Sequence, residues 1–200
     1  MAETSVESIL EAARAQFQRT GIRRTSGDDI ARSAGVNRAT LYRRVGTKDE
    51  IVRRTYIHET QRVLAVIEKA TGPVPTREDD PGFDPVAYIE RFFTVVTTQL
   101  RENQLLHQLL EIDQDDIVIG LTLKAGDPLT LSSALVADRI RTLRAYVANT
   151  EVSDIDDLAG TLARISQSLL LTPDAPPRLD TAKRLNEYAR RVIAPMILGR

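Results

Sequence analysis

The chain has 200 residues, of which 42% are hydrophobic and 28% charged, a composition typical of a globular protein with one large or two small domains. It has no cysteine, which excludes disulfides, thiolate metal sites and cysteine nucleophiles. The net charge of −1 is unevenly distributed: residues 12–54 carry 11 Lys and Arg against 4 Asp and Glu, whereas residues 61–200 carry 16 against 20. A basic N-terminal block therefore precedes a mildly acidic remainder.

The beginning of the chain carries no signal for export or membrane insertion. The first residues, MAETSVES, have neither the basic nor the apolar region of a secretory signal. The longest uninterrupted apolar run extends only from Val63 to Ile67, whereas about 20 apolar residues are needed to span a bilayer. We therefore expect a cytoplasmic protein with no membrane partner.

Almost every segment has helical rather than alternating periodicity. The first predicted helix has an apolar face within ILEAARAQFQRT and ends at Gly21, a residue suited to the turn past a helix end. Ser26 and Asp29 form a capping box for a short second helix, which we place from Asp28 to Ala34.

Two further helices follow at once. Asn37 is a favourable N-cap for a short third helix from Arg38 to Arg44. A second capping box begins at Thr47 and predicts a long helix that ends near Ala70. The segment from Thr71 to Pro85 holds four prolines and two glycines, so it is predicted to be a loop.

The remainder of the chain is also predicted to be helical. The dipeptide Asp84-Pro85 begins a helix rich in bulky apolar groups, and shorter helical pieces follow. A long helix is expected from Leu129 to Thr150, and two more begin at a capping box with Ser153 and at Asp180. Pro195 should kink or end the last helix. The predicted fold class is all-α, with about nine helices.

The second and third helices, joined by a tight turn, form a helix-turn-helix candidate. Gly35 permits the left-handed conformation of the turn, Ala31 is small where the helices would meet, and Val36 and Leu41 are apolar anchors. Such a unit presents its second helix to the DNA major groove. The residues predicted to contact DNA from this helix are Arg38, Ala39, Thr40, Tyr42, Arg43 and Arg44.

These side chains suit DNA because arginine can bond guanine or phosphate, hydroxyls can bond phosphate oxygens, and small apolar groups can touch a thymine methyl. Lys48, Thr25 and Ser26 lie at helix starts, where free backbone N–H groups could help them to hold phosphates. A run of charge on a helix is more often only a solvated face. We prefer that interpretation for the arginines that stand singly, namely Arg19, Arg23, Arg24, Arg53 and Arg54.

The segment from Ile9 to Val52 resembles the TetR-type, or tetracycline-repressor-like, transcriptional regulators. The resemblance lies in ILEAARAQFQRTG, TSGDDIARSAGV, RATLYRRV and TKDEIV taken together. It implies an N-terminal three-helix DNA-binding domain and a larger helical domain for ligand binding and dimerisation. It also implies that Thr40, Tyr42 and Lys48 contact phosphates, and that Arg38, Ala39 and Arg43 lie near the base edges.

Three positions depart from the family pattern. Ala39 stands where glycine is frequent, Arg44 where histidine is common and Val45 where a core phenylalanine is usual. The smaller Val45 removes volume from the core and leaves the angle of the recognition helix open. Ala39 and Arg44 leave the operator sequence open.

Helix-turn-helix proteins usually bind two half-sites about 34 to 36 Å apart, so a homodimer is expected. Each of the last two helices carries an apolar stripe that could form its interface. An alternative is that both stripes only close the core of the monomer, and periodicity does not separate the two. The resemblance favours a four-helix dimer interface containing Leu158, Leu162, Ile165, Leu169, Leu185, Ala189 and Val192.

The resemblance also places a ligand pocket among the helices between Val86 and Thr150. Each candidate for its lining is, taken singly, more often a packing or surface residue. The acidic cluster from Asp113 to Asp116 lacks the spacing of a calcium loop and is interpreted as a solvated helix end. The predicted pocket residues are Tyr88, Phe92, Gln99, His107 and Tyr146.

We therefore expect residues 1–50 to form the DNA-binding domain and residues 51–200 the helical ligand-binding and dimerisation domain. The predicted function is a homodimeric regulator, a repressor that a small-molecule effector releases from a palindromic operator on double-stranded DNA. The alternative is a ligand-independent architectural or partner-binding DNA protein of the same fold. No catalytic residues, metal site or cofactor are predicted, because the sequence has no phosphate-binding glycine loop, no metal-spaced cluster and only two isolated histidines.

Overall fold

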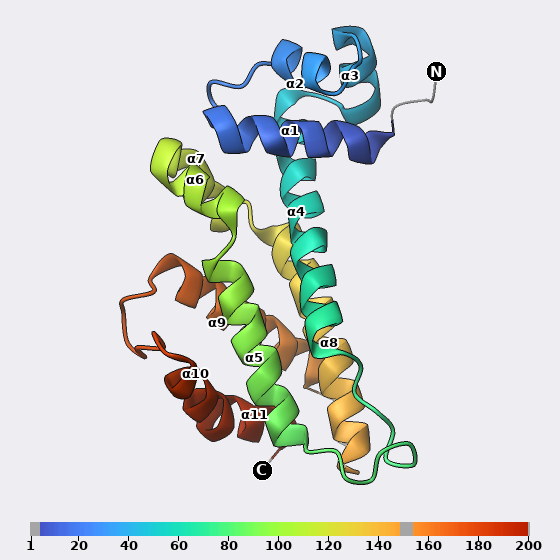
Figure 1. The fold of residues 1–200 in the computed structure, drawn as a ribbon, viewed down its shortest axis with the longest axis vertical. Helices are drawn as coiled ribbons and strands as arrows, with labels where there is room; N and C mark the ends of the chain where they lie inside the picture. Colours follow the sequence, from blue (N-terminus) through green and yellow to red (C-terminus); the bar gives the residue numbers. More distant parts are fainter. Residues whose placement is uncertain (1–4, 149–153, 200) are drawn as a thin grey trace. The chain divides into compact units, whose positions relative to one another are not determined.

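The computed structural model describes residues 5–148 and 154–199, and all regular elements within these ranges are helices. Contacts divide the chain into two compact units, the first formed by Met1–Arg62 with Glu102–Pro128 and the second by Val63–Arg101 with Leu129–Arg200. The all-α prediction is confirmed (Figure 1). No helix in the described ranges has the length and apolar character needed to cross a membrane.

The first unit begins with three helices, α1 (Val6–Thr20), α2 (Gly27–Ser33) and α3 (Arg38–Val45). The α2 helix begins one residue before its predicted start, and α3 begins at the predicted residue. The α1 helix ends at Gly21, whose φ of 82° is one that side chains with a Cβ rarely adopt. Both α2 and α3 pack against α1 (Figure 1). The side chains at the centre of this packing are fully or almost fully buried: Ile9, Ala13, Phe17, Ile30, Ala31, Leu41 and Val45.

The first unit also takes in the segment from Glu102 to Pro128, which was predicted to belong to the C-terminal domain. This segment contains α6 (Gln104–Ile112) and α7 (Gln114–Leu121), and α6 packs against α1. Leu105 and Leu109 of α6 are buried there. The helices around the helix-turn-helix candidate therefore come from two separate stretches of sequence.

The long helix α4 (Lys48–Thr71) begins in the first unit and continues into the second. Thr47 caps its start, because its Oγ1 accepts the Glu50 N–H at 3.3 Å. The start of α5 (Pro85–Arg101) is also the predicted one, since Asp84 Oδ1 accepts the N–H groups of Val86 and Ala87 at 2.9 and 3.1 Å. Short polar signals in the sequence were sufficient to locate both starts.

The second unit contains α5, most of α8 (Gly126–Tyr146) and α9 (Ile155–Leu171), together with the C-terminal helices. The α5 helix contacts α9, α10 (Ala182–Tyr188) and α11 (Ala194–Leu198). The predicted cap Ser153 and the last two residues of the helix predicted to end at Thr150 lie outside the described residues. The apolar core is built around Tyr88, Ile89, Ile140, Leu143, Ile155, Ala159, Ala189 and Ile193.

The C-terminal helix passes Pro195 without ending there. Between α10 and α11 the backbone forms a π-helical turn, η1 (Ala189–Ile193), and α11 then carries Pro195 in its first turn. Proline has no N–H to donate to the preceding turn, and a wider turn before it is one way in which a helix accommodates it. The predicted irregularity is therefore found a few residues before the proline itself.

Candidate nucleic-acid interface

The α2 helix is held by both halves of the predicted capping box. The Asp29 N–H donates to Ser26 Oγ at 3.2 Å, and the Ser26 N–H donates to Asp29 Oδ2 at 3.0 Å. The Ser26 hydroxyl also donates to Asp29 Oδ2 at 2.6 Å, and these bonds lower the pKa of the Asp29 carboxyl. Asp29 therefore stabilises the start of α2 most strongly in its ionised form.

The turn between α2 and α3 fixes the direction of the recognition helix. Gly35 has a φ of 68°, and the Val36 N–H after it donates to Ala31 O at 3.0 Å. Asn37 caps α3, since its Oδ1 accepts the Thr40 N–H at 2.7 Å. Val45, the residue that is smaller than the usual one in the family, is fully buried at the other end of α3.

The exposed edge of α3 carries the arginines predicted to contact DNA. The Arg38 guanidinium pairs with Asp28 at 3.0 Å and lies over the Tyr42 ring, 5.5 Å from its centroid. Ala39 and Arg43 are exposed, and Thr40 is half-buried. Arg44 is half-buried as well, and its carbonyl oxygen accepts a hydrogen bond from Arg54 at 3.2 Å.

Tyr42 is positioned by a glycine that was not among the predicted site residues. A Cβ on Gly27, at the start of α2, would lie 2.1 Å from the Tyr42 hydroxyl oxygen and 2.8 Å from the ring atom that carries it. The tyrosine ring therefore occupies the space of a missing side chain and joins α3 to the beginning of α2. The sequence signal was Gly27 directly after the cap Ser26, where almost any other residue would suit the helix better.

Lys48 and Thr25, which lie outside α3 and were predicted to contact phosphates, differ from each other in how far their side chains are buried. Lys48, the first residue of α4, is half-buried, and its Nζ donates to the carbonyl oxygen of Arg23 at 3.4 Å. Thr25 is buried, and its hydroxyl donates to Gly21 O at 2.6 Å and shares a 2.8 Å hydrogen bond with the Thr20 hydroxyl. The Thr25 hydroxyl therefore closes the loop before α2 from the inside, which leaves only the backbone of Thr25 for the predicted phosphate contact.

The acidic turn between α6 and α7 is not simply a solvated helix end. Asp113 is buried, with its side chain only 6% exposed, and its Oδ2 accepts the Arg23 N–H at 2.8 Å. The Arg23 guanidinium lies 3.5, 3.4 and 3.1 Å from the carboxylates of Asp113, Asp115 and Asp116, and hydrogen bonding to Asp116 raises its pKa. The interpretation of Arg23 and of this acidic cluster as merely solvated is corrected: together they join the α1–α2 loop to α6 and α7.

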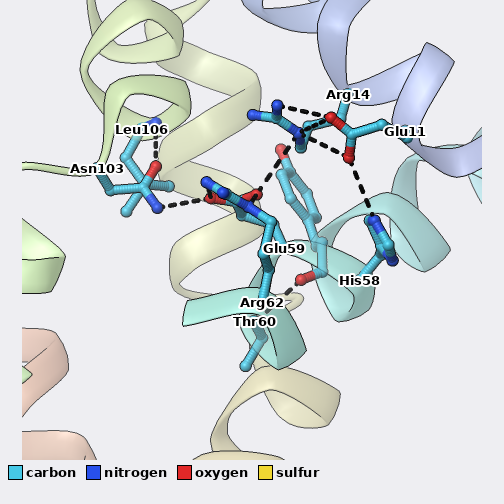
Figure 2. A network of polar contacts seen from close by, with 9 residues as sticks. Glu11, Arg14, His58, Glu59, Thr60, Arg62, Asn103 and Leu106 are labelled. Carbon is cyan, nitrogen blue, oxygen red and sulfur yellow. Dashed lines mark hydrogen bonds and ion pairs between the residues drawn. The ribbon is translucent and has the colours of Figure 1, made fainter. Parts of the chain in front are cut away.

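A second polar network joins α1, α4 and α6 within the first unit (Figure 2). Glu59 of α4 is buried, and its carboxylate accepts from Asn103 Nδ2 at 2.7 Å and from Arg62 Nε at 3.0 Å. Arg14 of α1 lies 3.9 Å from the same carboxylate. It also donates three hydrogen bonds to Glu11, which lower the pKa of the Glu11 carboxyl. Asn103 in turn caps α6, so the start of this helix is tied to the helices of the DNA-binding motif.

The predicted pocket residues are not gathered at one site. Tyr88 and Phe92 line an apolar cavity of about 50 Å³ within the second unit, and Gln99 is absent from its lining. His107 is exposed on α6 of the first unit. Tyr146 borders a different hollow of about 290 Å³ next to the loop before α5, and its hydroxyl donates to Asp80 O at 2.9 Å. Of the five predicted residues, only Tyr88 and Phe92 line this apolar cavity, and a shared ligand pocket for all five stays a prediction.

The stripes predicted to form a dimer interface are partly used inside the monomer. Leu162, Leu185 and Ala189 are buried in the core of the second unit and are not available to a partner in this conformation. Val192 is exposed, and the other three predicted residues are half-buried at the edge of this core: Leu158, Ile165 and Leu169.

Residues 9–55 match the family model for bacterial regulatory proteins of the tetR family. The probable HTH-type transcriptional regulator ArpR of Pseudomonas putida is 29% identical over 90% of this chain and 90% of its own. The TetR family repressor AlkX from Dietzia sp. strain DQ12-45-1b has a similar fold, with a TM-score of 0.66, 20% identity and coverage of 98% of this chain and 96% of its own. The transcriptional repressor QsdR of R. erythropolis also has a similar fold, with a TM-score of 0.63 and 23% sequence identity. The match covers 98% of this chain and 96% of QsdR.

These similarities agree with the geometry of the α2–α3 motif. Residues 9–55, which include the α2–α3 motif, are similar to the tetR family of bacterial regulatory proteins, and the chain has the same fold as the repressors AlkX and QsdR. The resemblance in the sequence of residues 9–52 is thereby confirmed. The relatives to which the chain is similar are regulators of transcription rather than enzymes.

Proposed function

We propose that the protein is a homodimeric repressor that binds a palindromic operator through α3 and leaves it when a small molecule binds the second unit. The observation that carries this proposal is the exposed basic edge of α3 on a frame of fully buried residues, fixed in direction by caps at α2 and α3. A rigid helix with an arginine-rich outer edge suits insertion into a major groove. Two solved proteins of this fold are described as repressors.

The proposed contacts divide into two groups. Arg38, Ala39, Arg43 and Arg44 would lie at the base edges, where arginine forms bidentate bonds with guanine. Ser26, Thr40, Tyr42 and Lys48 would hold phosphates and set the register of the helix on the DNA. In the free protein Asp28 pairs with Arg38, so this arginine would exchange one acceptor for another when it meets DNA.

The test is footprinting on the DNA that flanks the gene, followed by titration of the protected site at several salt concentrations. A palindromic footprint is expected, together with a steep loss of affinity with salt, at a log–log slope of about −0.9 for each phosphate contact. A flat salt dependence would show that phosphates do not contribute.

Single substitutions separate the two groups of contacts. Arg43→Ala should cost about 1 to 3 kcal/mol on the preferred operator and should reduce discrimination at one base position. Tyr42→Phe, which removes only the hydroxyl, should weaken binding to all sequences alike. Arg164→Ala is the control, because Arg164 is an exposed arginine on α9 in the other unit. If Arg43→Ala binds the operator as wild type does, α3 is not the recognition helix.

The size of the apolar cavity supports a second candidate, a DNA-binding protein of the same fold that uses no small ligand. Sites for small molecules usually measure about 300 to 1,000 Å³, and the cavity at Tyr88 and Phe92 has only about 50 Å³. The two functions differ in one measurement. A compound that raises the unfolding temperature and also releases operator DNA supports the ligand-controlled repressor.

A further inference from the structure

Two adjacent arginines in the loop between α1 and α2 have opposite surroundings. The Arg23 guanidinium faces three carboxylates at the turn between α6 and α7, which balance its charge. Arg24 is exposed and pairs with no carboxylate among the residues that the structure describes. The same loop therefore carries one arginine that is neutralised within the first unit and one that is not.

The Arg24 side chain is held at its inner nitrogen. Its Nε donates at 3.0 Å to the carbonyl oxygen of Thr20, the last residue of α1. The Thr20 hydroxyl in turn shares a 2.8 Å hydrogen bond with the hydroxyl of the buried Thr25. The two outer nitrogens of Arg24 bond to nothing in the described parts of the chain, so they can donate to an acceptor outside the protein. A side chain that is already held in this way loses less conformational entropy when it binds.

Arg24 lies between the groups that are proposed to hold phosphates. On its N-terminal side, Lys48 Nζ donates to the carbonyl oxygen of Arg23 at 3.4 Å. On its C-terminal side, Ser26 caps α2, and the Tyr42 hydroxyl lies against the first residue of that helix. Consecutive Cα atoms are about 3.8 Å apart, so the backbone positions that these groups approach lie within about 15 Å of one another.

The carboxylates that are nearest in the sequence do not neutralise Arg24. Asp28 pairs with Arg38 at 3.0 Å. Asp29 accepts the N–H and the hydroxyl of Ser26, and these bonds hold the start of α2. Arg24 thus keeps its charge available for an anion.

A phosphate of bound DNA suits this position better than an anion in solution. A single exposed ion pair in water contributes little, so Arg24 and Lys48 would hold an isolated ion only weakly. A phosphate of a duplex that α3 already binds is instead kept close to the loop, where its effective concentration is high.

We infer that Arg24 binds a backbone phosphate of the DNA through its two outer nitrogens, beside the phosphates proposed for Lys48 and Ser26. This inference rests on the proposed function, because it adds a contact to the same interface. It replaces the interpretation of Arg24 as a residue of a solvated face. A phosphate contact carries no sequence information, so its contribution is the same on every DNA sequence.

The test measures the affinity of the full-length protein for its operator and for a random-sequence duplex by fluorescence anisotropy, at several salt concentrations. In Arg24→Gln the log–log dependence of affinity on salt should become less steep by about 0.9 for each bound subunit, on both duplexes. This corresponds to an affinity about eightfold lower for each subunit at about 0.1 M salt. An unchanged slope in the folded variant, or a loss confined to the operator, would overturn the inference.

Two further variants separate a direct contact from a general effect of charge. Arg24→Lys keeps the positive charge, so it should keep the salt slope of the wild type. Arg53→Gln is the matched control, because Arg53 is an exposed arginine of the same unit that pairs with Glu50 and Asp127. Its removal should leave the slope unchanged. Equal changes of slope in Arg24→Gln and Arg53→Gln would show that only the net charge matters, and would overturn the contact.

The same measurements distinguish failure of this inference from failure of the proposed function. If the wild-type protein binds neither duplex, both are wrong. If it binds its operator and Tyr42→Phe weakens that binding, but Arg24→Gln leaves the salt slope unchanged, only the inference about Arg24 is wrong. A less steep slope on both duplexes in Arg24→Gln alone supports both proposals.

Discussion

Among single residues, the glycine at the start of α2 shapes the proposed DNA-binding surface, because it leaves room for Tyr42. Tyr42 occupies the space that a side chain on Gly27 would need, with its hydroxyl oxygen 2.1 Å from the Cβ position. The orientation of a residue on the recognition helix therefore depends on the identity of a residue on another helix. Thr25 does not contribute its side chain to this surface, because it is buried in the loop between α1 and α2.

Replacing Gly27 by Ala should displace the Tyr42 ring. We expect a loss of stability of about 1 to 3 kcal/mol from overpacking, and operator affinity reduced by about tenfold because the tyrosine hydroxyl is moved. Thermal unfolding and gel-shift titration measure the two effects. Gly126→Ala is the control, because a Cβ at Gly126 would meet no atom within 4 Å. Normal DNA binding by Gly27→Ala would mean that the position of Tyr42 is not important.

Asp29 makes the stability of α2 depend on pH. Hydrogen bonds from Ser26 lower the pKa of Asp29 below its ordinary value of 3.8, so its contribution is fully present above that value and is lost as the pH falls through the lower pKa of the folded state. Asp29→Asn should therefore be less stable than wild type at neutral pH, and the difference should shrink in acid. Chemical denaturation of both proteins at neutral and at acidic pH measures this difference in stability. A difference that stays constant with pH would contradict the role of the ionised carboxyl.

Among the elements, those that begin with a local capping signal were the ones that the sequence predicted well. Ser26, Asn37, Thr47 and Asp84 each bond to N–H groups two or three residues ahead, so their effect does not depend on the rest of the fold. The packing of α6 against α1 could not be predicted in this way. It depends on contacts such as that between Arg23 and Asp113, which are 90 residues apart in the sequence.

For the candidate site, too, local features could be predicted from the sequence and tertiary packing could not. Periodicity indicated which face of α3 is exposed, and Arg38, Ala39 and Arg43 are found there. Neither the burial of Thr25 nor the dispersal of the predicted pocket residues could be inferred from periodicity. Both result from which helices pack together, and helical periodicity gives the buried face of a helix without giving its neighbour.

The attachment of α6 and α7 to the α1–α2 loop can be tested at Asp113. Asp113→Ala should lower the free energy of unfolding by about 1 to 3 kcal/mol, because the Arg23 N–H and guanidinium lose a buried acceptor. Asp115→Ala is the matched control: Asp115 also faces Arg23, but its side chain is 78% exposed, so a change of at most about 1 kcal/mol is expected. Urea denaturation followed by circular dichroism measures both. Equal losses of stability in the two variants would show that the buried contact of Asp113 with Arg23 contributes no more than the exposed contact of Asp115.

For the whole molecule, the proposed dimer must use the part of the C-terminal helices that the monomer leaves exposed. Val192 is 38% exposed, whereas Leu185 and Ala189 on the same stretch are buried in the core. The interface is therefore expected to be narrower than the full stripes in the sequence. Its centre would lie near Val192 and the half-buried Leu158, Ile165 and Leu169.

Val192→Glu should weaken the dimer by about tenfold or more, since it places a charge in the apolar centre of the proposed interface. Sedimentation at several protein concentrations measures the dimer, and operator affinity should fall in parallel because two half-sites need two subunits. Val66→Glu is the control, as Val66 is 40% exposed on α4. A monomeric wild-type protein, or a Val192→Glu variant that dimerises normally, would contradict this interface.

The division of the first unit between two stretches of chain has a consequence for the order of events during synthesis. Domains generally fold from the N-terminus as the chain is made. Here α1, α2 and α3 can pack together early, but Arg23 and Glu59 acquire Asp113 and Asn103 only after residues 63–101 of the other unit have been made. The DNA-binding surface is thus expected to exist on the nascent chain before the helices that brace it, and it would become fully rigid only when most of the protein has been translated.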